Sequence, residues 1–180
     1  MKLTTREIII CGLFASITAI LAQISIPIPF TTVPLTMQVF AVMLCGTLLG
    51  PRLGSISQMI YILLGAIGMP VFAQMSGGIS AIVGPTGGFI LSFPIVTLVV
   101  GYFSYKYNTI QLTTIGMLIG LVLSYLIGTL QFALMMNVSM IEGLALCVIP
   151  FIVVDLIKIG LAVTLGTNLS KRLSLGMRAC

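Results

Sequence analysis

Two long stretches without a single charged residue dominate the first half of the sequence, one between Glu7 and Arg52 and one between Arg52 and Lys106. Over all 180 residues only 6% are charged and 59% are hydrophobic, whereas soluble proteins carry about 25% charged residues. Backbone groups that cross lipid must be hydrogen-bonded within their own segment, which favours helices. We therefore predict an all-α integral membrane protein, a single domain over residues 1–180.

The apolar segments predict six transmembrane helices in one bundle, at about residues 6–24, 35–50, 53–69, 88–105, 110–134 and 150–170. If the N-terminus lies in the cytoplasm, seven of the eight basic residues fall on the cytoplasmic side, as the positive-inside rule requires. These seven are Lys2, Arg6, Arg52, Lys106, Lys171, Arg172 and Arg178. This pattern predicts a cell-membrane protein with both termini in the cytoplasm. The basic residues are then explained by the membrane topology of the chain, and we expect no nucleic-acid partner.

The residue inventory excludes several kinds of chemistry. The chain has no histidine, the commonest general base and metal ligand. Its four cysteines, at positions 11, 45, 147 and 180, form no metal-binding or redox spacing. We therefore expect no enzyme, no catalytic residue, no metal and no cofactor.

The last apolar segment, PFIVVDLIKIGLAVTLGTNLS at 150–170, contains two opposite charges, Asp155 and Lys158. Three residues apart, they lie on one face of the predicted helix. Charges at membrane depth usually face a bundle interior or a cavity, where they mark a substrate or ion path. The alternative is a structural pair that neutralises itself. We interpret this face as the floor of a binding site.

A second unusual segment is the 21-residue loop MPVFAQMSGGISAIVGPTGGF at 69–89, which has five glycines, two prolines and no charge. Loops of this length are usually functional or disordered, and its apolar content argues against disorder. Glycines let main-chain groups approach a ligand closely. We predict a lid over a pocket, the alternative being a compact structural cap.

Other positions leave two interpretations open. Gln38 either points its amide inward or is a polar residue near the interface. Cys11, Ala15 and Ala19, spaced by four in the first span, serve packing inside the bundle or docking of a separate subunit. Gln131 is interpreted as a residue whose side chain forms a hydrogen bond between packed helices. Residues 144–150 either lie at the outer surface or join the last helix as one kinked span.

Four pieces of the sequence together resemble BioY, the biotin-specific S subunit of energy-coupling-factor (ECF) vitamin transporters. They are IPIPFTTVPLTMQ at 26–38, LGPRLG at 49–54, SGG…GPTGGF at 76–89 and PFIVVDLIK at 150–158. The resemblance implies the six-helix ECF S-component fold and a vitamin pocket near the outer face, closed by the loops at 24–37 and 69–89. It also implies biotin as transported ligand and, as partners, a transmembrane coupling subunit and two ATPase subunits.

Carried over position by position, the resemblance makes Asp155 and Lys158 the binding pair. The remaining substrate-binding candidates are Gln38, Gln74, Ser76, Gly77, Gly78, Gly84, Pro85, Thr86 and Gly87. It also favours docking of the coupling subunit at Cys11, Ala15 and Ala19. Some relatives have Asn where this chain has Ser76, and Arg where it has Ile90. An S subunit for another vitamin and a membrane scaffold without ligand remain the alternative functions.

Overall fold

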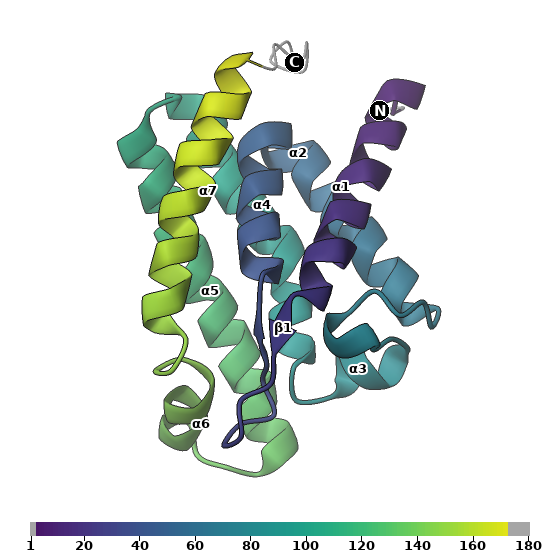
Figure 1. Ribbon diagram of the computed structural model, residues 1–180, viewed down its shortest axis with the longest axis vertical. Helices are drawn as coiled ribbons and strands as arrows, with labels where there is room; N and C mark the ends of the chain where they lie inside the picture. The colour runs from purple at the N-terminus through teal and green to yellow at the C-terminus, as the bar shows by residue number, and fades with distance from the viewer. Residues whose placement is uncertain (1–2, 173–180) are drawn as a thin grey trace.

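Apolar helices joined by short connections account for most of residues 3–172, the part of the chain that the computed structural model describes (Figure 1). Five of the helices are long and apolar enough to cross a membrane. They are α1 (Thr5–Gln23), α2 (Gln38–Ala66), α4 (Gly87–Tyr107), α5 (Ile110–Met136) and α7 (Ile152–Arg172). The shorter elements are β1 (Ser25–Ile26), β2 (Leu35–Thr36), η1 (Ala73–Met75), α3 (Ile79–Val83) and α6 (Met140–Cys147).

Helix α2 folds back on itself at Gly50, whose φ of 77° lies in the left-handed region that glycine adopts without strain. The thiol of Cys45 donates to the carbonyl of Gly54 at 3.9 Å, although nine residues of straight helix would separate them by about 13 Å. The predicted spans 35–50 and 53–69 are therefore the two arms of one bent element. This explains why five long helices stand where six spans were predicted.

The bent helix α2 occupies the centre of the bundle and packs against α1, α4 and α7, while α5 covers the other side of α4. Met43, Tyr61, Phe93, Val100 and Met117 form part of the buried core between these helices. The outer helix faces remain apolar and exposed, including most of α7. An exposed apolar surface of this extent fits a lipid environment.

The first turn of α1 and the last turn of α7 lie at the same end of the bundle, at the top of Figure 1. The turn at Gly50 and the end of α4 are also neighbours, since Ser104 donates to the carbonyl of Thr47 at 3.4 Å. Arg6, Lys106 and Arg172 occupy these helix ends, and Arg52 follows the bend of α2 at Gly50. Segment β1, helix α3 and helix α6 lie at the opposite end (Figure 1).

The structure corrects three boundaries. Pro34 does not begin the second helix, because Leu35 and Thr36 form a strand that pairs with β1 and α2 begins only at Gln38. Helix α7 begins at Ile152, two residues after Pro150, following a turn at 148–151. Helix α6 is separate from α7, so the kinked single span from 143 onward is not observed.

Candidate functional site

A cavity opens at the end of the bundle opposite the helix termini that carry the basic residues. It encloses about 840 Å³ between atoms, a value that includes the space of its open mouth. Segments far apart in sequence line it: the β1–β2 connection, the start of α2, the loop before α3, α4, α5, α6 and α7. The lining residues are Thr32, Val33, Pro34, Thr36, Gln38, Val39, Phe72, Ala73, Gln74, Ser76, Thr86, Phe89, Ile90, Phe93, Ser124, Tyr125, Cys147, Phe151, Asp155 and Lys158.

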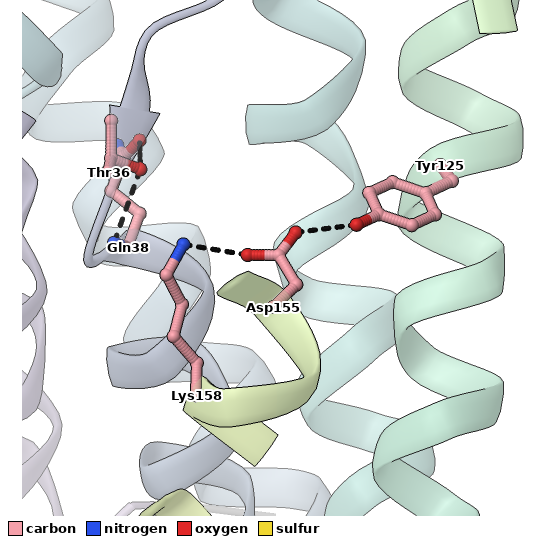
Figure 2. Close-up of polar contacts among 5 residues, drawn as sticks. All are labelled: Thr36, Gln38, Tyr125, Asp155 and Lys158. Carbon is pink, nitrogen blue, oxygen red and sulfur yellow. Dashed lines mark hydrogen bonds and ion pairs between the residues drawn. The ribbon is translucent and has the colours of Figure 1, made fainter. Parts of the chain in front are cut away.

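The floor of the cavity is formed by two charged residues from the first two turns of α7. The ammonium of Lys158 lies 2.6 Å from Oδ1 of Asp155, and both residues are almost fully buried, at 4% and 3% exposure. The hydroxyl of Tyr125 on α5 donates to Oδ2 of the same carboxylate at 2.6 Å. Both oxygens of Asp155 are therefore held, and the carboxylate is oriented from two helices (Figure 2).

A second polar group faces the first across the cavity. The amide of Gln38 donates to the hydroxyl of Tyr61 at 2.7 Å, and that hydroxyl donates to the carbonyl of Val71 at 3.0 Å. The hydroxyl of Thr36 donates to Oε1 of Gln38 at 3.1 Å. Figure 2 shows the ammonium of Lys158 between Gln38 and Asp155. The floor thus combines one cation, one carboxylate and neutral hydrogen-bonding groups.

The loop before α3 forms one wall of the cavity. Phe72 is 1% exposed and its ring packs edge-on against Tyr61, with centroids 5.5 Å apart. There is room for this ring because residue 65 is glycine; a Cβ there would overlap it. Gln23 at the end of α1 fixes the loop by donating to the carbonyl of Phe72 at 3.0 Å and accepting from the N–H of Met75 at 2.9 Å.

Helix α5 anchors the second half of the same loop. The amide of Gln131 donates to the carbonyls of Ile82 and Gly84 at 2.7 and 2.8 Å. The sequence indicated a helix-packing hydrogen bond at Gln131, and the two bonds join α5 to the last turn of α3 and to Gly84 directly after it. This segment leads directly into Thr86 and Phe89 at the cavity wall.

Six of the eleven substrate-binding candidates line this cavity: Gln38, Gln74, Ser76, Thr86, Asp155 and Lys158. The other five, Gly77, Gly78, Gly84, Pro85 and Gly87, belong to the loop but not to the lining. Two of them have a clear structural role. Gly78 adopts a φ of 92° where α3 begins, and a Cβ on Gly87 would overlap the carbonyl of Ile82.

Sequence reasoning missed Tyr125, Ser124 and most of the apolar wall, which includes Phe89, Phe93 and Phe151. A Ser-Tyr pair in the middle of a predicted lipid-spanning helix was the available signal for the first two. The aromatic residues gave none, because phenylalanine in a membrane span ordinarily packs against lipid or the core. Cys147 also lines the cavity, and its burial raises the thiol pKa to about 12, so the thiol is protonated at neutral pH.

The three small residues of α1 divide between the two interpretations left open by the sequence. Cys11 and Ala15 are 0% and 1% exposed. The thiol of Cys11 donates to the carbonyl of Leu53 at 3.4 Å, and Ser57 donates to the carbonyl of Cys11 at 2.9 Å. These contacts favour packing against α2 for Cys11 and Ala15. Only Ala19 is partly accessible to a partner.

The arrangement is suited to binding. Within residues 3–172 there is no cluster of three or more His, Cys, Asp or Glu side chains that could hold a metal. An oriented carboxylate and a lysine at the bottom of an aromatic-walled cavity can hold a small molecule with both donors and an acceptor on an otherwise apolar ring system.

Comparison with known proteins gives one consistent result. The family model for the BioY family matches residues 1–175. A protein of Pyrococcus horikoshii named probable biotin transporter BioY is 44% identical over 164 residues, covering 91% of this chain and 96% of the relative. The biotin transporter BioY of Thermotoga maritima is 35% identical over 167 residues, covering 92% and 96%.

The fold has a close counterpart among solved structures. It matches the crystal structure of the S-component for biotin from an ECF-type ABC transporter with a TM-score of 0.87 and 26% sequence identity. The match covers 94% of this chain and 95% of the other. The chain therefore shares the overall fold of that S-component.

Proposed function

This chain belongs to the BioY family, and we propose that it binds biotin in the cavity described above and serves as the substrate-specific S subunit for its uptake. Relatives named biotin transporter and the similarity to a biotin S-component support the substrate. The observation that carries the proposal is the buried Asp155–Lys158 pair at the floor of a cavity that opens at one end of the bundle.

The chemistry of biotin matches the cavity. Biotin has a ureido ring with two N–H donors and one carbonyl acceptor, an apolar bicycle and a valerate chain that ends in a carboxylate. We expect Asp155 to accept a hydrogen bond from a ureido N–H, and Lys158 to donate to the ureido carbonyl or to the carboxylate. The aromatic wall, including Phe72 and Phe93, would enclose the bicycle. The glycines at 77, 78, 84 and 87, with Pro85, would shape the loop that covers it.

The distribution of charge supports access from the extracellular side. The basic residues Arg6, Arg52, Lys106 and Arg172 lie at the end of the bundle remote from the cavity, whereas Glu142 lies on α6 next to it. Under the positive-inside rule the basic end is cytoplasmic. The cavity then faces outward, with both termini in the cytoplasm.

Energy for active uptake would come from partner subunits. The sequence contains no GxxxxGK[ST] motif for nucleotide phosphates. We propose a transmembrane coupling subunit and two ATPase subunits as partners. The exposed apolar face of α1, which carries Ile9, Leu13, Ile20 and the partly accessible Ala19, is the surface we expect to contact the coupling subunit.

The direct test is equilibrium binding of radiolabelled biotin to the full chain, purified from biotin-starved cells with no ATPase present. We expect stoichiometric binding by the wild type and at least about a thirtyfold loss of affinity in Asp155→Asn and Lys158→Ala, as for a truncated buried charge pair. Lys106→Ala is the matched control, because it removes the same charge at the opposite end and should bind normally. A folded, monodisperse wild type that fails to bind biotin would overturn the proposal and point to another vitamin.

A further inference from the structure

The charges of the cavity cancel one another. Among its twenty lining residues, Asp155 and Lys158 are the only charged ones. They form an ion pair with each other at 2.6 Å. The lining therefore has a net charge of zero and no cation free to neutralise an anionic ligand.

A carboxylate brought to this floor would meet an unfavourable environment. Burying an ionised carboxylate is expensive unless it gains its own partner. To provide that partner, Lys158 would have to leave Asp155, which would then become the uncompensated buried charge. Both oxygens of Asp155 already accept hydrogen bonds, from Lys158 and from Tyr125. The floor is thus built for a neutral polar group that offers donors and an acceptor.

The mouth of the cavity is different. Its exposed lining residues are Thr32, Gln74 and Ser76, which are polar and uncharged. A carboxylate placed there stays hydrated, so its charge changes the free energy of binding little in either direction. The rest of the wall is largely apolar and includes the buried side chains of Phe72, Ile90 and Phe93.

From this gradient we infer that the protein recognises the neutral ring end of its ligand and accepts biotin whose carboxyl group is converted to an amide. This rests on the proposed function and extends its substrate class to biotinyl amides, including biotin linked through its carboxyl group to the amine of lysine. Such amides are the products expected when proteins carrying amide-linked biotin are degraded by proteolysis. The reaction that supplies this substrate is therefore peptide-bond hydrolysis.

The test is competition against radiolabelled biotin on the full chain with three unlabelled competitors. Biotin itself sets the reference. The primary amide of biotin removes the charge and keeps the ring. Diaminobiotin, which lacks the ureido carbonyl, keeps the carboxylate and removes the group expected at the floor. We expect the amide to bind within about tenfold of biotin, and diaminobiotin to lose at least about a hundredfold, as expected for a site left with unpaired polar groups.

The outcomes separate this inference from the proposed function. If biotin does not bind at all, the proposed function fails. If biotin binds and its amide is weaker by more than tenfold, the inference is overturned, since a carboxylate paired with Lys158 would lose about thirtyfold or more on neutralisation. If diaminobiotin binds as well as biotin, the floor of the cavity does not recognise the ureido ring, and the inference is also overturned.

A variant at the mouth adds a gain-of-function readout. The side chain of Gln74 is exposed, so Gln74→Arg would place a cation near the expected carboxylate. We expect it to raise the preference for biotin over its amide by several-fold. Gln111→Arg is the control, because it adds the same charge at the exposed start of α5, at the opposite end of the bundle, and should leave the preference unchanged. An unchanged preference in Gln74→Arg with biotin still bound would contradict the placement of the carboxylate at the mouth.

Discussion

The hydroxyl of Tyr125 donates a hydrogen bond to Oδ2 of Asp155 at 2.6 Å, across 30 residues of sequence. It joins the middle of α5 to the first turns of α7 and orients the carboxylate without carrying charge. Lys158 holds the other oxygen from the same helix as Asp155. The carboxylate is thus fixed by two helices, which pre-organises the acceptor that we expect biotin to meet.

Tyr125→Phe tests this relationship. Removing the hydroxyl leaves Asp155 held only by Lys158, and a hydrogen bond to a charged group contributes about 1.5–3 kcal/mol. We expect the Kd for biotin to rise by about tenfold or more, measured by equilibrium binding on the folded variant. Tyr102→Phe is the control, because its hydroxyl accepts a hydrogen bond from the exposed Lys106 at 2.7 Å, near the end of α4 remote from the cavity. Unchanged affinity in Tyr125→Phe would show that the Tyr125 hydroxyl does not contribute to biotin binding.

Variants of the ion pair distinguish its effect on stability from its effect on biotin binding. Asp155→Asn or Lys158→Ala leaves one buried charge without its partner, which costs about 3–5 kcal/mol. The double variant Asp155→Leu with Lys158→Met removes both charges, so we expect it to regain much of the Tm lost by the single variants. The affinity for biotin should fall by at least about thirtyfold in all three variants.

Thermal unfolding in detergent and biotin binding, measured on the same samples, distinguish the alternatives. A double variant that still binds biotin would make the pair purely structural. A double variant as unstable as the single variants would show that the fold depends on the pair itself.

The membrane class, the approximate helices and the shared face of Asp155 and Lys158 were predictable, because long uncharged runs and two isolated charges within an apolar segment can be recognised from the sequence alone. The bend at Gly50 was visible as a turn, but whether α2 forms one element or two spans depends on geometry that spacing does not encode. Tyr125 and Phe72 escaped prediction because their roles arise from packing between helices distant in sequence.

The glycines of the loop at 69–89 illustrate the same limit. Composition predicted close backbone approach, and Gly77 and Gly87 do allow it, since a Cβ would overlap the carbonyl of Met69 or of Ile82. What they approach is other parts of the same loop, while the cavity is lined by their neighbours Gln74, Ser76 and Thr86. A glycine pattern predicts tight backbone geometry without identifying what lies against it.

Gly65→Ala tests the aromatic wall. An added Cβ would overlap the ring of Phe72, which is 1% exposed and cannot move without reshaping the cavity. Overpacking of this kind costs about 1–3 kcal/mol, so we expect a lower Tm and weaker biotin binding. Gly160→Ala is the matched control, since nothing lies within 4 Å of the added atom. There we expect unchanged binding and slightly higher stability, as helix propensity favours alanine by about 1 kcal/mol.

A pH effect is expected at the start of α6. The carboxylate of Glu142 accepts hydrogen bonds from the backbone N–H and the hydroxyl of Ser139, and these bonds hold its pKa below the ordinary value of 4.5. Since the pKa is lower in the folded state, the stabilising effect is present above pH 4.5 and is lost as the pH falls through the folded value. The first turn of α6 should therefore loosen in acid.

Hydrogen exchange of the α6 amides in the wild type and in Glu142→Gln, compared at equal pH, measures this effect. The variant should exchange faster than the wild type at neutral pH, and the two should converge in acid. A difference that persists unchanged at pH 3 would mean that the carboxylate charge is not what stabilises this helix.

Gln131→Leu tests whether the loop between α3 and α4 controls release of the ligand. The amide of Gln131 donates to the carbonyls of Ile82, in the last turn of α3, and of Gly84, the first residue of that loop. Leucine of similar size would leave both carbonyls without this partner. Because residues 82–86 lead into the cavity wall, we expect faster hydrogen exchange over this segment and faster dissociation of biotin. The dissociation rate should rise by about tenfold, since two hydrogen bonds of about 1 kcal/mol each are lost and partly replaced by bonds to water. The association rate should change less, since most affinity changes within one complex arise in dissociation. Gln111→Leu, at the opposite end of the same helix, should alter neither rate. Unchanged dissociation in Gln131→Leu, with exchange increased, would show that the loop loosens without governing release.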